Sequence, residues 1–349
     1  MILKGTFTKE NLDRIRKTRK VNPPVLERAI FALGLLEALS KVGCEFIFKG
    51  GSSLMLLLDK PMRLSTDCDI LVKPDYNIEF YIEKASKIYP FISFEESIRK
   101  TSKNIAKKHF RFSYNSIIKN GEVTILLDVL FAETPYSEIC EKKIVNDFLI
   151  TDGNDLSVRI PTVNAILGDK LTAFAPHTIG INYYNSNFSN DKRLEVIKQF
   201  YDCATLFDYA SDFNKIRDNY ISVAKEEIKY RNLDITYIDS LYDTFNCLLS
   251  IASRGFINQS EYENLLNGMR KVKDHIYGEV FTAETAINHS AKVMLLVAGI
   301  IKNVDILNIK INNHENIKDT KYKKLNYLNN SRTKDAFNMI AEALEILES

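Results

Sequence analysis

Two aspartates, Asp67 and Asp69, follow a Gly-Gly-Ser-Ser turn at residues 50–53. In a strand, residues two apart point to the same face, so both carboxylates converge while Cys68 points away. Their mutual repulsion is relieved when a cation sits between them, and Mg²⁺ prefers oxygen ligands of this kind. A pair of solvated aspartates is the alternative. The apolar run at residues 70–72, which predicts a buried strand, weakens that alternative.

A third carboxylate, Asp128, interrupts a nearly continuous apolar run at residues 123–131. Such a run predicts a strand that is covered on both faces. Because an unpaired carboxylate there is costly, a partner or a metal neutralises it, or it lies at the rim of the sheet. A structural aspartate bonded to arginine or to backbone is the alternative. Three converging aspartates could hold two metal ions and orient a hydroxyl for in-line attack on a phosphate.

The turn of Gly50, Gly51, Ser52 and Ser53 lies between a predicted strand at 46–49 and a short apolar helix. Glycines let backbone amides approach a phosphate, and the start of a helix favours an anion. The serines could cap the helix and donate to phosphate oxygens. An ordinary strand-to-helix turn capped by serine is the alternative.

Three basic side chains and one further aspartate are also candidates. Arg63, in the turn before the aspartate pair, could steady the carboxylates or contact a triphosphate; an exposed arginine is the alternative. Lys170 falls on the apolar stripe of a predicted helix at 161–175, so it either snorkels outward or serves a buried anion such as a triphosphate. Lys198 and Asp202 are four residues apart on the next predicted helix, where spacing alone indicates a surface ion pair.

Length and composition limit the classes of protein. The chain of 349 residues is long enough for two domains, and its net charge of +2 argues neither for nor against nucleic acid. Five scattered cysteines without a CxxC pair predict a reduced, cytosolic protein with no structural zinc. We expect no signal peptide, and the apolar run at 293–301 is too short to span a membrane. The expected location is therefore the cytoplasm.

Two kinds of periodicity divide the chain. Strands are predicted at residues 46–49, 70–72, 109–114 and 123–131, and early helices at 25–42 and 75–89. Later helices are predicted at 161–175, 190–209, 212–231, 235–254, 260–275, 282–302 and 332–348. The expected fold is α/β (α+β), with a mixed sheet in a domain at 1–155 and a helical domain at 156–349. Ser260 and Glu263 fit a capping box, and residues 304–311 fit loops or a short strand.

In combination these residues resemble the AbiEii/AbiGii toxin family of nucleotidyltransferases, within the DNA polymerase β-like superfamily. The family's Gly-Gly-[Ser/Thr]-x-Leu and Arg-x-[Ser/Thr]-x-Asp-x-Asp motifs are matched at 50–54 and 63–69. Its later hydrophobic-Asp-hydrophobic strand is matched at 127–129. Its Lys-Leu pair and its Arg/Lys-x-x-x-Asp segment are matched at 170–171 and 198–202.

The resemblance covers roughly residues 45–206 and departs from the family in two places. Members commonly have Lys-Asp before the final Tyr-Asp, whereas this chain has Lys198-Gln199. The interval from Lys170 to Lys198 is long and includes an Asn/Tyr-rich stretch at 182–190.

The resemblance implies the toxin of a toxin–antitoxin pair that acts in abortive infection and phage defence. A neighbouring antitoxin is implied, although relatives include pairs that form no complex. The implied reaction transfers NMP from an NTP, with GTP or a pyrimidine NTP as candidates, to RNA such as tRNA and releases pyrophosphate. A protein or small-molecule hydroxyl as acceptor, or a non-catalytic NTP-binding module, is the alternative. Intact Asp67, Asp69 and Lys170 argue against the non-catalytic module.

The resemblance also implies roles for the candidate residues. The metal, Mg²⁺ or Mn²⁺, would lie between Asp67, Asp69 and Asp128. Lys170 would bind phosphate and stabilise charge in the transition state, and Asp202 would position the nucleotide or the attacking hydroxyl. The other implied nucleotide contacts are Gly50, Gly51, Ser52, Ser53, Arg63 and Lys198.

Overall fold

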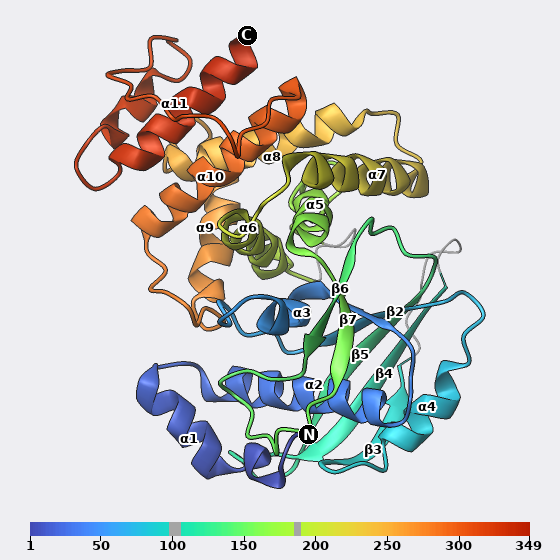
Figure 1. Cartoon of the computed structure of the whole chain (residues 1–349). Helices are drawn as coiled ribbons and strands as arrows, with labels where there is room; N and C mark the ends of the chain where they lie inside the picture. Colours follow the sequence, from blue (N-terminus) through green and yellow to red (C-terminus); the bar gives the residue numbers. More distant parts are fainter. Residues whose placement is uncertain (98–105, 185–189) are drawn as a thin grey trace. The chain divides into compact units, whose positions relative to one another are not determined.

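The computed structural model describes residues 1–97, 106–184 and 190–349 (Figure 1). Part of the Asn/Tyr-rich stretch, residues 185–189, therefore lies outside the described residues. The chain forms two compact units, one of Met1–Thr162 with Asp274–Glu279 and the other of Val163–Lys273 with Val280–Ser349. The first unit contains the sheet, and the second is helical.

Within the described residues, seven strands form one mixed sheet in the order β3-β4-β5-β2-β1-β7-β6. β2 runs parallel to β5 and β1 runs parallel to β7, while the other neighbours are antiparallel. This arrangement confirms the expected mixed sheet. The strands are β1 (Ile47–Lys49), β2 (Cys68–Val72), β3 (Phe91–Glu96), β4 (Ala106–Asn115), β5 (Glu122–Phe131), β6 (Ile139–Lys143) and β7 (Ser157–Pro161).

Hydrophobic patterning in the sequence did not predict three of the strands, β3, β6 and β7. β3 and β6 are the two edges of the sheet. Most residues of β3 are exposed, and β6 reads Ile-Cys-Glu-Lys-Lys with no buried residue. An edge strand needs only one neighbour and tolerates charge, so its sequence carries little of the apolar signal. β7 is only five residues long and alternates exposed with buried side chains.

The helices of the first unit are η1 (Lys4–Phe7), α1 (Lys9–Thr18), α2 (Pro23–Lys41), α3 (Gly50–Leu57) and α4 (Ile78–Ala85). α2 begins after Asn22, whose side chain accepts from the backbone N–H of Val25. Its prolines occupy the first helical turn, where no intrahelical hydrogen bond is lost. α2 is buried along most of its length and packs against β2 and β5.

The burial of β5 corrects one expectation. Val123, Ile125, Leu127 and Val129 are buried, whereas the residues that alternate with them are half-buried or exposed. β5 is therefore fully covered on one face only. Asp128 lies on the other, more open face, and burial of an unpaired charge is avoided there.

The second unit confirms the expected helical region. Its helices are α5 (Val163–Ala173), α6 (Arg193–Phe207), α7 (Phe213–Arg231), α8 (Tyr237–Ala252), α9 (Gln259–Val272), α10 (Ala283–Lys302), η2 (Lys323–Leu328) and α11 (Lys334–Glu348). α5 packs on α6 and α7, α6 packs on α9, and α10 packs on α6, α8 and α11. Within the described residues, no helix combines the length and the apolar character needed to cross a membrane.

Residues 304–311 form turns and loops, which decides between the two alternatives expected there. One local prediction in this unit was wrong. The capping box at Ser260 is absent, because the N-cap of α9 is Asn258, two residues earlier. The side chain of Asn258 accepts from the backbone N–H of Glu261, which leaves Ser260 inside the first turn. Competing N-cap residues close together in the sequence explain the error.

Candidate active site

A row of polar residues crosses four adjacent strands of the sheet. Lys49 of β1 is paired with Asp69 of β2, and Asp69 is paired with Asp128 of β5. Asp128 is in turn paired with His109 of β4. Directly paired residues point to the same face, so the strand register places these four side chains side by side. We call these four residues the polar row.

His109 is a member of this row that sequence analysis missed. Its Nδ1 lies 2.6 Å from Oδ1 of Asp128. The His109 side chain is 11% exposed and that of Asp128 is 32% exposed, so the carboxylate is the more accessible member. No local sequence pattern marks His109, because its partner, Asp128, comes from a neighbouring strand.

The aspartates differ in accessibility. Asp67 is exposed and lies just before β2, whereas Asp69 is half-buried within it. The residue between them, Cys68, is fully buried on the covered face. The pKa of its thiol is raised well above the usual value, first by burial and then by the negative charges of Asp69, Asp67 and Asp128. The three carboxylates thus create one shared negative field around this position.

Gly50 is required beside Asp69 for two reasons. Its φ of +75° lies in the left-handed region, which side chains other than hydrogen disfavour. A Cβ on Gly50 would also lie 2.0 Å from Oδ2 of Asp69. Gly51 is equally confined, since a Cβ there would lie 2.4 Å from Nη2 of Arg63. The two glycines therefore bring the start of α3 directly onto the carboxylate and the guanidinium group.

The serines of the turn act differently from the prediction. The N-cap of α3 is Lys49, without a side-chain capping bond, so the expectation that serine caps this helix was wrong. Ser52 and Ser53 are fully buried within the first turns of α3. Ser52 Oγ donates to the carbonyl oxygen of Asp67, and Ser53 Oγ donates to that of Gly50 at 2.9 Å. Ser52 thereby ties α3 to the aspartate segment.

The guanidinium group of Arg63 contacts the same turn at Gly51. Arg63 is 5% exposed, which contradicts the alternative of an exposed surface arginine. Nη1 donates to the carbonyl oxygen of Leu64 at 3.2 Å, and the residue forms an isolated bridge with Ile276. The guanidinium group therefore packs between Gly51 and neighbouring backbone.

The three predicted metal ligands share one kind of donor atom. Asp67, Asp69 and Asp128 offer oxygen donors only, as Mg²⁺ and Mn²⁺ prefer. Asp69 and Asp128 occupy paired positions on strands about 4.8 Å apart. The missing side chain of Gly50 leaves the space that the Asp69 carboxylate fills. Asp67 lies one position before β2, so the strand register does not place its side chain.

The remaining candidates belong to the helical unit. Nζ of Lys170 on α5 lies 3.0 Å from Oδ2 of Asp202 on α6, and their side chains are 8% and 1% exposed. Nζ also donates to Oε1 of Gln199 at 3.0 Å. Lys170 therefore does not snorkel outward, and Asp202 is no surface residue. Lys198 is half-exposed one position before Gln199.

The contact of Gln199 with Lys170 offers a physical reason for the departure from the family pattern. Gln199 stands where family members commonly carry aspartate, and here it accepts from Lys170 as a neutral amide. One buried ammonium group thus faces one buried carboxylate, Asp202. A second carboxylate at this position would leave an excess negative charge in a buried environment, which is costly.

The mixed sheet, the helix that begins with Gly50 and Gly51, and the paired Asp69 and Asp128 agree with the nucleotidyltransferase fold expected from the sequence. The model of the AbiEii family, described as the nucleotidyl transferase AbiEii toxin of a type IV toxin–antitoxin system, matches residues 34–278. The chain therefore belongs to the AbiEii family of nucleotidyltransferase toxins. A family of this kind implies an antitoxin as partner.

Two solved structures from Helicobacter pylori are similar to the chain. JHP933 is 13% identical with a TM-score of 0.45, and the match covers 80% of this chain and 94% of JHP933. A second structure, described as a proposed nucleotidyltransferase, is 14% identical with a TM-score of 0.46, and the match covers 81% of this chain and 99% of that one. No curated protein matches the chain.

Proposed function

We propose that this enzyme transfers an NMP from an NTP to an RNA acceptor, with tRNA as the first candidate, and releases pyrophosphate. The observation that carries the proposal is the strand register that pairs Asp69 with Asp128 beside the start of α3. Carboxylates held side by side on an accessible face can bind a divalent cation, and that cation can in turn bind a triphosphate.

In this proposal Asp67, Asp69 and Asp128 would hold Mg²⁺ or Mn²⁺. That ion would neutralise triphosphate charge and lower the pKa of an attacking hydroxyl. His109 holds the Asp128 carboxylate in one orientation through its 2.6 Å contact. Asp128 is thereby kept from turning toward solvent.

The triphosphate would lie against the start of α3. The backbone N–H groups of Gly50 and Gly51 are the proposed cradle, because the positive end of a helix favours an anion. The hydroxyls of Ser52 and Ser53 already donate to carbonyl oxygens, so their contribution is to hold the turn closed. Arg63 would steady this turn through its contact with Gly51.

In the helical unit, we propose that Lys170 and Lys198 contact the nucleotide. Lys170 would bind a phosphate while Asp202 and Gln199 hold its ammonium group in place. Asp202 thus acts on the nucleotide through Lys170. An ammonium group fixed in this way loses little rotamer freedom when it meets an anion.

The test is a transfer assay with the purified full chain, Mg²⁺, total cellular RNA and each labelled NTP in turn. We expect one or two NTPs to label small RNA, and Asp69→Asn to abolish the labelling. Label on protein in place of RNA would replace the acceptor in the proposal. No incorporation under any condition, with a folded protein, would contradict the proposed reaction.

The proposed biological role is that of a toxin acting in the cytoplasm during phage infection, held in check by its antitoxin without a required stable complex. Expression of the wild-type chain alone should slow growth of the host, and Asp67→Ala should relieve the effect at matched protein levels. Equal growth of both strains in several hosts would contradict toxicity by nucleotide transfer.

A further inference from the structure

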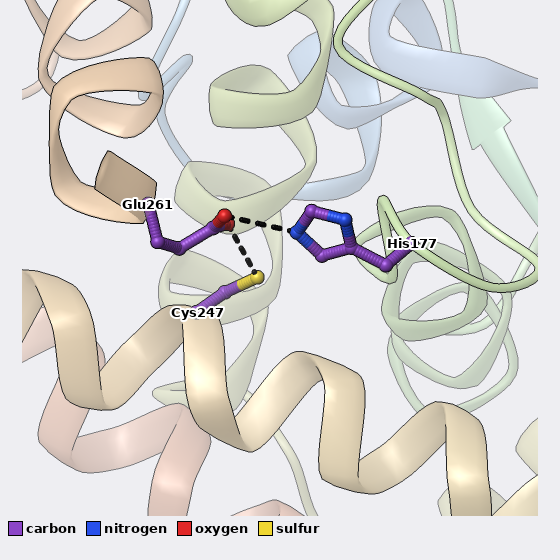
Figure 2. Close-up of side chains that lie close together, drawn as sticks. All are labelled: His177, Cys247 and Glu261. Atoms are coloured by element: carbon purple, nitrogen blue, oxygen red, sulfur yellow. Dashed lines mark hydrogen bonds and ion pairs between the residues drawn. The ribbon is translucent and has the colours of Figure 1, made fainter. Parts of the chain in front are cut away.

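A second cluster of chemically reactive side chains lies wholly within the helical unit. Figure 2 shows His177, Cys247 and Glu261 with their side chains turned toward one another. His177 lies in the segment between α5 and α6, Cys247 on α8 and Glu261 on α9. Three separate segments thus bring one nitrogen, one sulfur and one carboxylate to the same point.

The donor atoms are close enough to share one ion. Nε2 of His177 lies 2.9 Å from Oε2 of Glu261, and Sγ of Cys247 lies 3.1 Å from Oε1 of Glu261. All the ligand atoms lie within 4.8 Å of one another. In tetrahedral zinc sites the donors are separated by about 3.4–3.6 Å, as follows from bond lengths of about 2.0–2.3 Å. Small movements of these side chains would therefore admit zinc.

Asp243, one turn before Cys247 on α8, holds the segment that carries His177. Its Oδ2 accepts from the backbone N–H of His177 at 2.8 Å and from the Thr178 hydroxyl at 2.9 Å. Its Oδ1 lies 3.9 Å from Sγ of Cys247. Tyr183 donates its hydroxyl to Oε1 of Glu261. Hydrogen bonds that orient the ligand groups in this way are a regular feature of metal sites.

We propose that His177, Cys247 and Glu261 bind a zinc ion and leave its fourth position to a solvent molecule. A thiolate and an imidazole nitrogen favour zinc over Mg²⁺, so this site would select a different metal from the aspartates of the sheet. On binding, the Cys247 thiol loses its proton to solvent, and bonds to the ion replace the hydrogen bonds of Glu261 with His177 and Cys247.

An ion can reach this point. The His177 side chain is 54% exposed, whereas those of Cys247 and Glu261 are buried. The three proposed ligands line a cavity of about 540 Å³. The exposed histidine can therefore capture the ion first, and the buried ligands then enclose it. The site would connect the segment after α5 to α8 and α9.

Another group in the described part of the chain offers a contrast. His314, Glu342 and Glu345 also lie close together. The two ring nitrogens of His314 contact different carboxylates, Nε2 with Glu342 at 3.1 Å and Nδ1 with Glu345 at 3.4 Å. This group contains no thiolate, so it cannot produce a cobalt–thiolate band, and one imidazole with two carboxylates favours zinc less strongly. This group therefore serves as the matched control.

The expectation of no structural zinc rested on the absence of paired cysteines in the sequence. That expectation applies to sites with several thiolates. A site with one thiolate takes its other ligands from histidine and carboxylate side chains that are distant in the sequence. The proposal thus replaces that expectation, because the fold brings together ligands that are distant in the sequence.

The test begins with metal-free full-length protein. Titration with ZnCl₂ against a chromophoric chelator should give one zinc ion per chain, and Co²⁺ should produce a thiolate-to-cobalt absorption band. His177→Ala, a change at an exposed side chain, should weaken zinc affinity by more than about 100-fold while the fold is kept. Cys247→Ser should abolish the cobalt–thiolate band. His314→Ala and Cys140→Ser should leave both signals unchanged.

Two results would overturn the proposal. One is a wild-type protein that binds no stoichiometric zinc and shows no cobalt–thiolate band. The other is a folded His177→Ala protein with wild-type zinc affinity. In either case the cluster is a hydrogen-bond network that joins α8 and α9 to the segment after α5. Circular dichroism of each variant identifies any failure to fold, and the His177 variant alone suffices if Cys247→Ser does not fold.

Discussion

The polar row of the sheet and the Lys170–Asp202 pair of the helical unit use charge in opposite ways. In the row, two carboxylates occupy neighbouring positions and remain partly accessible, so their repulsion is relieved by a ligand or by solvent. In the pair, one ammonium group meets one carboxylate, and both are almost fully buried. The repulsion between like charges in the row lowers stability unless a ligand relieves it. In the pair the two charges are opposite, and stability depends on both partners.

The largest expected effect concerns the row. Asp69→Asn and Asp128→Asn should each lower nucleotide transfer by about 10³-fold, since a neutral amide supplies no charge to a divalent cation. Stability to urea should stay the same or rise, because repulsion between the carboxylates is relieved. Asp75→Asn, at an exposed position after β2, is the control. Full activity of Asp69→Asn would remove the basis of the metal assignment.

Removal of one partner from the buried Lys170–Asp202 pair should lower stability, unlike the substitutions in the row. Lys170→Met alone removes the ammonium group that contacts the buried Asp202 carboxylate and should cost about 3–5 kcal/mol in the free energy of unfolding. The double variant Lys170→Met/Asp202→Leu removes both charges and should recover to within about 1 kcal/mol of the wild type.

Activity of the stable double variant then separates the two roles of Lys170. If Lys170 serves a phosphate, the restored protein remains inactive in the transfer assay. If the restored protein is also active, Lys170 and Asp202 are purely structural. Urea denaturation and labelled-NTP transfer on the same preparations provide both measurements.

A smaller effect is expected where α3 meets the row. Gly50→Ala should displace the Asp69 carboxylate, because the new Cβ would lie 2.0 Å from Oδ2. We expect activity to fall by about 10²-fold, as for misplacement of a reacting group by about 1 Å. Gly43→Ala shares a left-handed φ of +78° but meets no atom within 4 Å. It should cost about 1–2 kcal/mol of stability and leave activity per folded molecule unchanged.

The smallest effect is expected at the end of the row. His109→Ala should reduce transfer by about 10-fold, since it removes only the group that orients Asp128. The apparent affinity for Mg²⁺ in the assay should weaken in parallel. Arg111→Ala, on the same strand and paired with the exposed Glu95, is the control. A His109→Ala protein with unchanged activity and Mg²⁺ dependence would confine the site to the aspartates.

Much of the fold followed from local patterns. The long helices and the central strands were predicted because each carries its own periodicity of buried residues. The edge strands β3 and β6 were missed because their stability comes from a neighbour's backbone. The covered and open faces of β5 could not be told apart over residues 125–131, since both carry leucine in the sequence.

The candidate site shows the same division between features set by local sequence and features set by distant segments. By itself, the sequence determined which residues offer chemistry: the Gly-Gly-Ser-Ser turn, the aspartates and a lysine on an apolar stripe. These signals are local, because backbone preference and side-chain periodicity depend on near neighbours in the chain.

Only the tertiary structure decided the partners. The pairing of Asp69 with Asp128, the contact of His109 with Asp128 and the burial of Lys170 against Asp202 all join distant segments. The meeting of His177, Cys247 and Glu261 is of the same kind. Strand register and helix packing are set by the summed burial of many side chains, so no short motif can specify which two polar groups meet.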